Sequence, residues 1–344
     1  MIHNLKVLID RLARPLGSLR ISVTDRCNLR CQYCMPEEEY VWLPRHDILA
    51  FEEIVRLTRI FVDAGVHRVR ITGGEPLLRR DLTVLIRQLA EVEGLQDLAL
   101  TTNGVLLAEL APALRDAGLH RITVSLDTLQ PDRFRALARF DELPRVLAGL
   151  GAARAHFETV KIDSVLVRGT NDDEILSLLD YARNLGAEMR FIEYMDVGGA
   201  TRWSPDRVVS RTEILRVIEA VHGPLSAVTT ESWTPADRFA TRDGLVFGVI
   251  SSTTQPFCRT CDRSRITADG LWFRCLYARD GTDLRGLLRS GASDAAIREV
   301  IDATWSLRED RGAELRAEQR DRTPFIPVSR LRKDPHLEMH TRGG

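Results

Sequence analysis

Short apolar runs rich in β-branched residues alternate with longer stretches in which apolar residues recur at helical spacing, from residue 19 to about residue 195. The runs predict six strands, at 19–24, 67–72, 97–102, 120–126, 159–167 and 188–194. The stretches between them predict helices near 51–64, 79–92, 106–117, 143–156 and 172–185. Gly65, Gly118 and Gly186 follow three of these helices, where a left-handed residue is expected. This alternation predicts parallel βαβ units, in either a barrel or an open doubly wound sheet.

The alternation ends after Asp196. Residues 198–205 are rich in Gly, Ser and Pro, which is typical of a linker or an active-site loop. Beyond them the pattern predicts a helix near 211–222, short strands around 225–230, 245–251 and 264–273, and a helix near 293–306. We therefore predict two units, residues 1–197 and a smaller α+β region at 198–344. Residues 307–323, dense in Arg and Glu, are predicted to be a solvated surface segment, and the terminal Arg-Gly-Gly, considered alone, a flexible tail.

The composition is that of a globular chain. Of 344 residues, 44% are hydrophobic and 28% are charged, which excludes the composition typical of disorder. The net charge of −1 argues against a broad nucleic-acid surface. No apolar stretch is long enough to cross a bilayer, and the first residues lack the pattern of a secretory leader. We therefore expect a cytoplasmic protein without nucleic-acid or membrane partners.

The cysteines form two triads, Cys27, Cys31 and Cys34, then Cys258, Cys261 and Cys275. In a reducing compartment such clusters are better explained as metal ligands than as disulfides. Thiolates select zinc or iron-sulfur clusters, and a closed zinc site requires a fourth Cys or His close by. The first triad lacks one, whereas three thiolates can hold a cubane cluster and leave one iron open. An iron-sulfur cluster is therefore favoured over zinc, and buried structural cysteines rank third.

The motif Thr72-Gly73-Gly74-Glu75-Pro76 ends the second predicted strand. Considered alone, it is consistent with an ordinary strand-to-helix turn, because Pro76 suits the start of a helix. Glycines also let a ligand approach the main chain closely, and Glu75 offers a hydrogen-bond acceptor. Together with the first triad, the motif favours a ligand site at the end of this strand.

The C-x3-C-x2-C spacing, with Tyr33 before its last cysteine, and the Gly-Gly-Glu-Pro motif resemble the radical S-adenosylmethionine (SAM) superfamily. Within it, the sequence resembles the molybdenum cofactor biosynthesis protein A (GTP 3′,8-cyclase) family over nearly the whole chain. This resemblance is carried by residues 19–36 (LRISVTDRCNLRCQYCMP), 70–76 (RITGGEP), 101–104 (TTNG), 124–127 (VSLD), 171–174 (NDDE) and 190–198 (RFIEYMDVG). The C-x2-C-x13-C spacing of the second triad and the terminal double glycine match as well.

The resemblance implies an α/β fold: an incomplete (βα)6 TIM-type barrel, the radical SAM core, that opens onto the smaller C-terminal α+β region. It implies a 4Fe-4S cluster on each triad and SAM as a cofactor. The implied reaction is that of a lyase. SAM binds the open iron of the first cluster and is cleaved reductively, and the 5′-deoxyadenosyl radical takes hydrogen from C3′ of GTP. Attack on C8 then gives 3′,8-cyclo-7,8-dihydro-GTP for molybdenum cofactor (molybdopterin) biosynthesis.

By the same resemblance, the SAM-binding residues are Tyr33, Gly73, Gly74, Glu75, Ser125 and Met195. The GTP-binding residues are Arg20, Arg70, Thr101, Lys161, Arg263, Ser264 and Arg265. Arg20, Arg263 and Arg265 are the implied catalytic residues, because guanidinium groups bind phosphate oxygens through paired hydrogen bonds. The open iron of the second cluster is expected to bind guanine, and Gly343 and Gly344 to form a tail. Without the resemblance, Met195 is consistent with core packing, and Arg263 and Arg265 with an exposed strand face.

Three positions depart from the family's usual residues. Asp163 replaces an asparagine near Lys161, so we expect it to neutralise part of that lysine's charge. Thr341-Arg342 replaces more apolar residues, which weakens the expectation that the tail enters the active site. Ala13-Arg14 replaces Gly-Arg, a change from which we expect little effect.

The resemblance also implies three partners: GTP, a downstream cyclic pyranopterin monophosphate synthase, and an electron donor such as flavodoxin or ferredoxin. The oligomeric state is open, a homodimer being one option. Two other interpretations remain. Another radical SAM enzyme with an auxiliary cluster, such as a peptide-modifying one, usually has more than three cysteines in its auxiliary region. A noncatalytic zinc scaffold would not require the Gly-Gly-Glu-Pro motif or a barrel.

Overall fold

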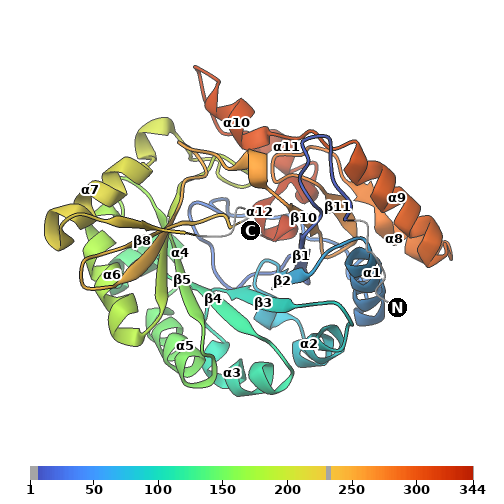
Figure 1. Cartoon of the computed structure of the whole chain (residues 1–344), viewed down its shortest axis with the longest axis horizontal. Coiled ribbons are helices and arrows are strands. Elements are labelled where there is room, and N and C mark those ends of the chain that lie inside the picture. Colours follow the sequence, from blue (N-terminus) through green and yellow to red (C-terminus); the bar gives the residue numbers. More distant parts are fainter. Residues whose placement is uncertain (1–6, 230–233, 344) are drawn as a thin grey trace.

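The six predicted strands form one parallel sheet that curves into an incomplete barrel with helices on its outside (Figure 1). The computed structural model describes residues 7–229 and 234–343. The strands are β1 (Ser18–Ser22), β2 (Arg68–Thr72), β3 (Asp97–Thr102), β4 (Arg121–Ser125), β5 (Val160–Leu166) and β6 (Glu188–Glu193). The helices are α1 (Phe51–Asp63), α2 (Leu82–Ala90), α3 (Leu107–Asp116), α4 (Pro131–Ala138), α5 (Leu143–His156) and α6 (Ile175–Leu185). Every neighbouring pair from β1 to β6 is parallel, which confirms the predicted βαβ units.

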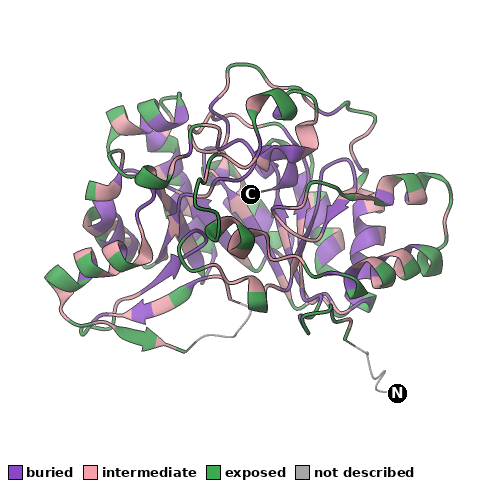
Figure 2. Ribbon diagram, turned by 90° about the horizontal axis from the view of Figure 1, so that it is seen from above, coloured by how far each residue is buried: buried purple, intermediate pink, exposed green. Residues whose placement is uncertain are grey.

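The core lies between the outer face of the barrel and the apolar sides of the helices. In α1, Ile54 and Phe61 are buried whereas Glu52 and Arg59 are exposed, as an amphipathic helix on a sheet requires. Along β5 every second residue is buried, and the intervening residues face the barrel interior. Figure 2 shows the same division, with buried strands inside and exposed helical faces outside. The inner face is thus left free for polar side chains.

The C-terminal region continues the same sheet at both edges. β10 (Arg263–Ile266) pairs in parallel with β1, and β9 (Val246–Ile250) pairs in parallel with β6. Antiparallel strands extend each edge: β11 (Leu271–Phe273) and β12 (Thr282–Asp283) beyond β10, and β8 (Asp237–Ala240) and β7 (Ser226–Val228) beyond β9. Strands from both sides of residue 197 therefore share one sheet, and the division into 1–197 and 198–344 remains a prediction.

The remaining helices are α7 (Arg211–His222), α8 (Leu284–Arg289), α9 (Asp294–Ser306), α10 (Gly312–Ala317), α11 (Val328–Leu331) and α12 (Met339–Arg342). The helices expected near 211–222 and 293–306 are confirmed. α4, α8, β8 and the helices after α9 were not predicted, because such short elements carry too few periods to be recognised. The strand expected at 264–273 is instead the antiparallel pair β10 and β11, joined by a turn in which Gly270 has a φ of +89°. No helix within the described ranges is both long and apolar enough to span a membrane.

The segment 307–323 is not simply a solvated surface. Arg308 is 1% exposed, and Arg316 and Arg322 reach the buried carboxylate of Asp196 at the end of β6. Arg316 Nε donates to Asp196 Oδ2 at 2.7 Å, Arg322 Nη2 to Oδ1 at 2.9 Å, and the hydroxyl of Tyr277 to Oδ1 at 2.8 Å. The arginines of this segment suggested a solvated surface, but Arg316 and Arg322 instead attach the segment to the end of the barrel through Asp196.

The turn before β1 contains a strained residue. Ala13 has a φ of +59°, a left-handed conformation that costs a residue with a Cβ atom about 1 kcal/mol. Its N–H donates to the carbonyl of Asp10 at 3.1 Å, and Asp10 in turn binds Arg14. Glycine adopts this conformation without strain, so the alanine carries a conformational cost that the expectation of little effect did not include.

We expect Ala13→Gly to stabilise the protein by about 0.5 to 1 kcal/mol, because it relieves the left-handed strain. The matched control is Ala303→Gly on the exposed face of α9, which should destabilise by a similar amount, since glycine weakens a helix beyond its first turn. Denaturant unfolding of both variants measures the two effects. Destabilisation by both substitutions would contradict the assignment of strain to Ala13.

Candidate active site

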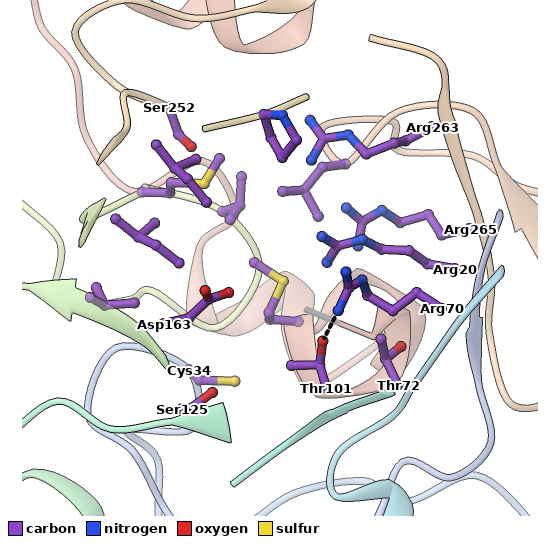
Figure 3. Close-up of a pocket in the computed structure, with 18 of the residues that line it drawn as sticks. Arg20, Cys34, Arg70, Thr72, Thr101, Ser125, Asp163, Ser252, Arg263 and Arg265 are labelled. Carbon is purple, nitrogen blue, oxygen red and sulfur yellow. Dashed lines mark hydrogen bonds between the residues drawn. The ribbon is translucent and has the colours of Figure 1, made fainter. Parts of the chain in front are cut away.

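All six cysteines line one cavity of about 450 Å³ inside the barrel. The first triad lies beyond the carboxyl end of β1. Cys258 and Cys261 precede β10, whose parallel register aligns Arg263 with Ser18, so they lie near the amino end of β1. The cavity therefore joins two thiol sites at opposite ends of the strands. Figure 3 shows it with polar side chains from several strands pointing inward.

The first triad fits a cluster better than a single metal ion. Burial, together with the nearby charge of Glu75, raises the pKa of Cys27 to about 11, and burial raises the pKa of Cys34 further. These thiols therefore ionise only when a cation takes the place of the proton. In the part of the chain that the structure describes, no three Cys, His, Asp or Glu side chains converge as ligands of one metal ion would. All three cysteines line the cavity, and three thiolates can hold a cubane cluster with one iron open.

The glycines of the Gly-Gly-Glu-Pro motif lie directly against the loop that carries Cys27. Gly74 N donates to Thr24 O and Glu75 N donates to Arg26 O, both at 2.7 Å. A Cβ atom on Gly74 would clash with the carbonyl of Arg26, and one on Gly73 would lie 2.6 Å from that of Thr24. Both glycines line the cavity, so they are available to a ligand, but this backbone contact alone already requires them.

Glu75 does not face the cavity as the ligand-binding prediction requires. It is buried, and its carboxylate accepts hydrogen bonds from Leu77 N at 2.9 Å, Thr102 Oγ1 at 2.8 Å and Asn103 N at 2.7 Å. Burial raises its pKa to about 7, and these donors oppose that shift. Glu75 therefore joins the ends of β2 and β3, and its contact with SAM remains a prediction.

The other predicted SAM contacts face the cavity. Ser125 and Met195 line it, at the ends of β4 and β6. Tyr33 lines it as well, and its hydroxyl donates to Asp127 Oδ2 at 2.8 Å. Asp127 also accepts from Val165 N at 2.8 Å, so the ring of Tyr33 is held between the first triad and β4.

Three arginines form a row across neighbouring strands. Arg265 on β10 pairs with Arg20 on β1, and Arg20 pairs with Arg70 on β2. Figure 3 shows the three side chains side by side in the cavity. Burial, and next the charge of a neighbouring arginine, lowers the pKa of each to about 9, so all three stay cationic at neutral pH. Such a row suits a ligand with several negative charges.

Arg263 extends this row toward the second triad. It lines the cavity, and its guanidinium lies 4.6 Å from the ring centroid of Phe257. Burial alone would raise the pKa of Cys261, but Arg263 and Arg308 outweigh burial and lower it to about 7. Arg263 and Arg265 are therefore inside the barrel, not on the exposed strand face considered above.

Lys161 and Asp163 both line the cavity, but they do not act on each other as expected. The carboxylate beside Lys161 is Glu188, 4.0 Å from its ammonium group, and burial and then Arg190 lower the lysine pKa to about 7. Asp163 instead supports the cationic forms of Arg20 and Arg70. Asp163 Oδ1 is buried and has no hydrogen-bond partner among the described residues.

Two predicted GTP contacts differ in position. Thr101 lines the cavity and accepts a hydrogen bond from Arg70 Nη1 at 3.0 Å. Ser264 lies between two inward-facing arginines of β10, so its side chain points to the opposite face of that strand. Its buried hydroxyl has no partner within the described residues, and only its main chain can serve the predicted contact.

Several residues of the cavity wall were not predicted from the sequence. Arg190 and Ile192 line the cavity from alternate positions of β6, so the period of two in that strand would have indicated them. Ser252 and Phe257 come from irregular segments, for which no periodic signal exists.

The C-terminal tail enters the barrel mouth. The carbonyl of Gly343 accepts a hydrogen bond from Arg265 Nη1 at 2.8 Å. Thr341 and Arg342 are buried, and Arg342 donates to the carbonyls of His336 at 2.6 Å and Leu276 at 2.7 Å. The polar residues before the double glycine therefore do not keep the tail out, and up to Gly343 it is not a free tail. Gly344 lies outside the described residues.

Comparison with known proteins agrees with this architecture. Residues 21–182 match the family described as Radical SAM superfamily, and residues 187–314 match Molybdenum Cofactor Synthesis C. Streptococcus suis SuiB bound to its precursor peptide SuiA shares the fold, with a TM-score of 0.60 and 17% identity over 92% of this chain and 69% of that one. The fold and the site therefore define a radical SAM protein.

The closer relatives identify the family. GTP 3′,8-cyclase 3 of Mycobacterium bovis is 53% identical over 97% of this chain and 90% of its own length. The GTP 3′,8-cyclases of Acidothermus cellulolyticus and Staphylococcus aureus are 51% and 40% identical, over 90% and 93% of this chain and 88% and 95% of their own lengths. The chain belongs to the GTP 3′,8-cyclase family.

We expect Gly74→Ala to displace the loop that carries Cys27, because the added methyl group meets the carbonyl of Arg26. Overpacking of this kind costs roughly 1 to 3 kcal/mol of stability. Anaerobic reconstitution should load less iron and sulfide than in the unmutated protein. Gly151→Ala is the matched control, since a Cβ atom at this position in α5 meets nothing within 4 Å. Equal loading of both variants would contradict the close packing.

Proposed function

We propose that this protein is a radical SAM GTP 3′,8-cyclase, a lyase that converts GTP to 3′,8-cyclo-7,8-dihydro-GTP in molybdenum cofactor biosynthesis. The observation that carries the proposal is the row of Arg265, Arg20 and Arg70 between two cysteine triads in one cavity. The row supplies cationic donors for a triphosphate, and the triads supply thiolates at each end. The names of the relatives support the same substrate.

In this proposal the first triad, Cys27, Cys31 and Cys34, holds a 4Fe-4S cluster. A cluster held there would supply the electron for reductive cleavage of SAM, which is the chemistry that removal of hydrogen from C3′ of GTP requires. The protein's own contribution is to orient SAM. Gly73 and Gly74 offer main-chain groups, and the Tyr33 ring, held by Asp127, lies against the same site.

The second triad, Cys258, Cys261 and Cys275, is proposed to hold a second 4Fe-4S cluster near the guanine base. The pKa of Cys261, lowered to about 7 by Arg263 and Arg308 against the effect of burial, favours the thiolate that a cluster requires. Arg263, Arg265, Arg20 and Arg70 then bind the phosphates along the strands. Burial of these guanidinium groups strengthens each charge-assisted contact, because water competes little inside the cavity.

An electron donor such as flavodoxin or ferredoxin and the downstream cyclic pyranopterin monophosphate synthase are part of the proposal, because the family implies them. A cytoplasmic location is proposed as well. A peptide-modifying activity has weaker support. Likeness to SuiB at 17% identity concerns the fold, and a compact row of buried arginines suits a small polyanion better than a peptide.

Cysteine substitutions test the separate roles of the two triads. Cys31→Ala should abolish the production of 5′-deoxyadenosine from SAM, because the first triad is lost. Cys275→Ala should keep uncoupled 5′-deoxyadenosine production but form no cyclised GTP. Chromatography of both products after anaerobic reconstitution measures this. Full cyclisation by Cys275→Ala, or unchanged SAM cleavage by Cys31→Ala, would reject the assignments.

Arginine substitutions test the triphosphate site. Arg20→Met should weaken GTP binding by roughly 1.5 to 3 kcal/mol, about ten- to a hundredfold, because one charge-assisted contact is lost. Guanosine, which has no phosphates, should bind almost as before. Lys161→Met should have a smaller effect, since the lowered pKa of about 7 leaves this lysine partly neutral.

Binding of GTP and guanosine should be compared at one ionic strength, because salt screens such contacts. Arg298→Met is the matched control: its guanidinium pairs with Asp302 on α9 and is not part of the cavity wall. Equal losses for GTP and guanosine in Arg20→Met would indicate a disturbed fold and would remove the phosphate role.

A further inference from the structure

A buried cluster of charged residues lies behind the second triad, outside the cavity. Asp10 is its centre, and the side chains of Asp10, Arg14 and Arg308 are at most 1% exposed. Asp10 Oδ2 accepts hydrogen bonds from Arg14 Nε at 2.6 Å and from Arg308 Nη1 at 3.2 Å. Asp10 Oδ1 accepts the main-chain N–H groups of Leu12 and Arg14, both at 2.9 Å. The carboxylate thus fixes both guanidinium groups.

The same guanidinium groups also donate hydrogen bonds to main-chain carbonyls of the second triad. Arg14 Nη1 donates to the carbonyl of Cys258 at 2.7 Å and to that of Asp310 at 2.8 Å. Arg308 Nη1 donates to the carbonyl of Cys261 at 2.8 Å. The short turn that spaces two of the three cysteines is therefore supported from behind by two buried arginines.

A second carboxylate lies at the edge of the cluster, because Asp310 Oδ2 is 3.9 Å from Arg308 Nε, beyond hydrogen-bond distance. Arg308 lies 4.4 Å from the ring centroid of Trp305, so its position is fixed by packing as well as by hydrogen bonds. Arg14 Nη2 and Arg308 Nε are buried and have no hydrogen-bond partner among the described residues. Arg308 Nε therefore has only its long ion pair with Asp310 on this side, and Arg14 Nη2 keeps an N–H group without a hydrogen-bond acceptor in the described ranges.

We propose that Arg14 and Arg308, held by Asp10, are positioning residues for an iron-sulfur cluster on Cys258, Cys261 and Cys275. This inference rests on the proposed second cluster. Three thiolates around a cubane leave an overall negative charge, which grows on reduction, and outer contacts of this kind tune both metal retention and reduction potential. The two arginines keep the cysteines at cluster spacing and stabilise the reduced state by their charge.

The second cluster can be isolated by replacing Cys27, Cys31 and Cys34 with Ala, which gives a parent protein with one intact triad. In this parent, Arg308→Gln removes the charge but keeps a donor, and Arg308→Lys keeps the charge but loses the planar fork. Arg11→Gln is the matched control, because Arg11 lies in the same turn and its exposed side chain pairs with Glu309, while its main-chain N–H, which donates to the carbonyl of Arg308, is unchanged by the substitution. The measurements are iron and sulfide content, the rate of iron loss to a chelator, and the midpoint potential followed by electron paramagnetic resonance.

The parent should bind about four irons. Arg308→Gln should lose iron to the chelator roughly ten- to a hundredfold faster and have a lower midpoint potential than the parent. Arg308→Lys should restore the potential toward that of the parent, and Arg11→Gln should match the parent throughout. If Arg308 had a purely structural role, its substitutions would change the free energy of unfolding, but the midpoint potential would not depend on whether the new side chain is charged.

Two results would overturn the inference in distinguishable ways. A parent that takes up no iron or sulfide would remove the second cluster, and with it both that part of the proposed function and the role of these arginines. A parent that binds a cluster whose potential and iron loss are unchanged in Arg308→Gln would overturn the role of the arginines alone. Where Arg308→Gln does not fold, a potential in Arg308→Lys lower than that of the parent would overturn the role of charge.

Discussion

The parallel pairing of β10 with β1 is the constraint on which the rest of the site depends. It closes one side of the barrel with a strand from the C-terminal region, and its register places Arg265 beside Arg20. The same pairing brings Cys258 and Cys261 to the end of the barrel opposite the first triad. A shift of one residue would turn both arginines of β10 away from the cavity, because side chains alternate along a strand. The main-chain hydrogen bonds between β10 and β1 thus determine how the two cysteine triads and the row of arginines are placed in the cavity.

The interior of this barrel keeps more positive charge than its own carboxylates neutralise. Elsewhere the protein pairs buried charges closely, as where Asp196 receives Arg316, Arg322 and the hydroxyl of Tyr277. In the cavity, by contrast, Asp163 is the carboxylate that supports Arg20 and Arg70. The hydrogen bonds of the row go to neutral acceptors, from Arg70 to Thr101 and from Arg265 to the carbonyl of Gly343. Burying such charge costs stability unless a partner compensates it. The paired charges around Asp196 are typical of a structural cluster, whereas the unpaired positive charge of the arginine row is typical of a site for an anionic ligand.

The two triads are supported by different means. The loop of the first triad is held by main-chain contacts with Gly73 and Gly74, where any side chain would intrude. The turn of the second triad is held by the side chains of Arg14 and Arg308, which reach it from distant parts of the chain.

The sequence alone determined the six barrel strands and most of their helices, because apolar periodicity reports which face of a local element is buried. It also identified both triads and the family, since cysteine spacing and short motifs are local features. It did not determine that 264–273 is two strands, that Glu75 faces inward to Thr102 and Asn103, or that Lys161 meets Glu188 and not Asp163. Nor did it indicate that Arg308 is buried or that Ala13 is strained. These outcomes depend on strand register and on contacts between residues far apart in the chain, and only the tertiary structure decides which distant groups meet.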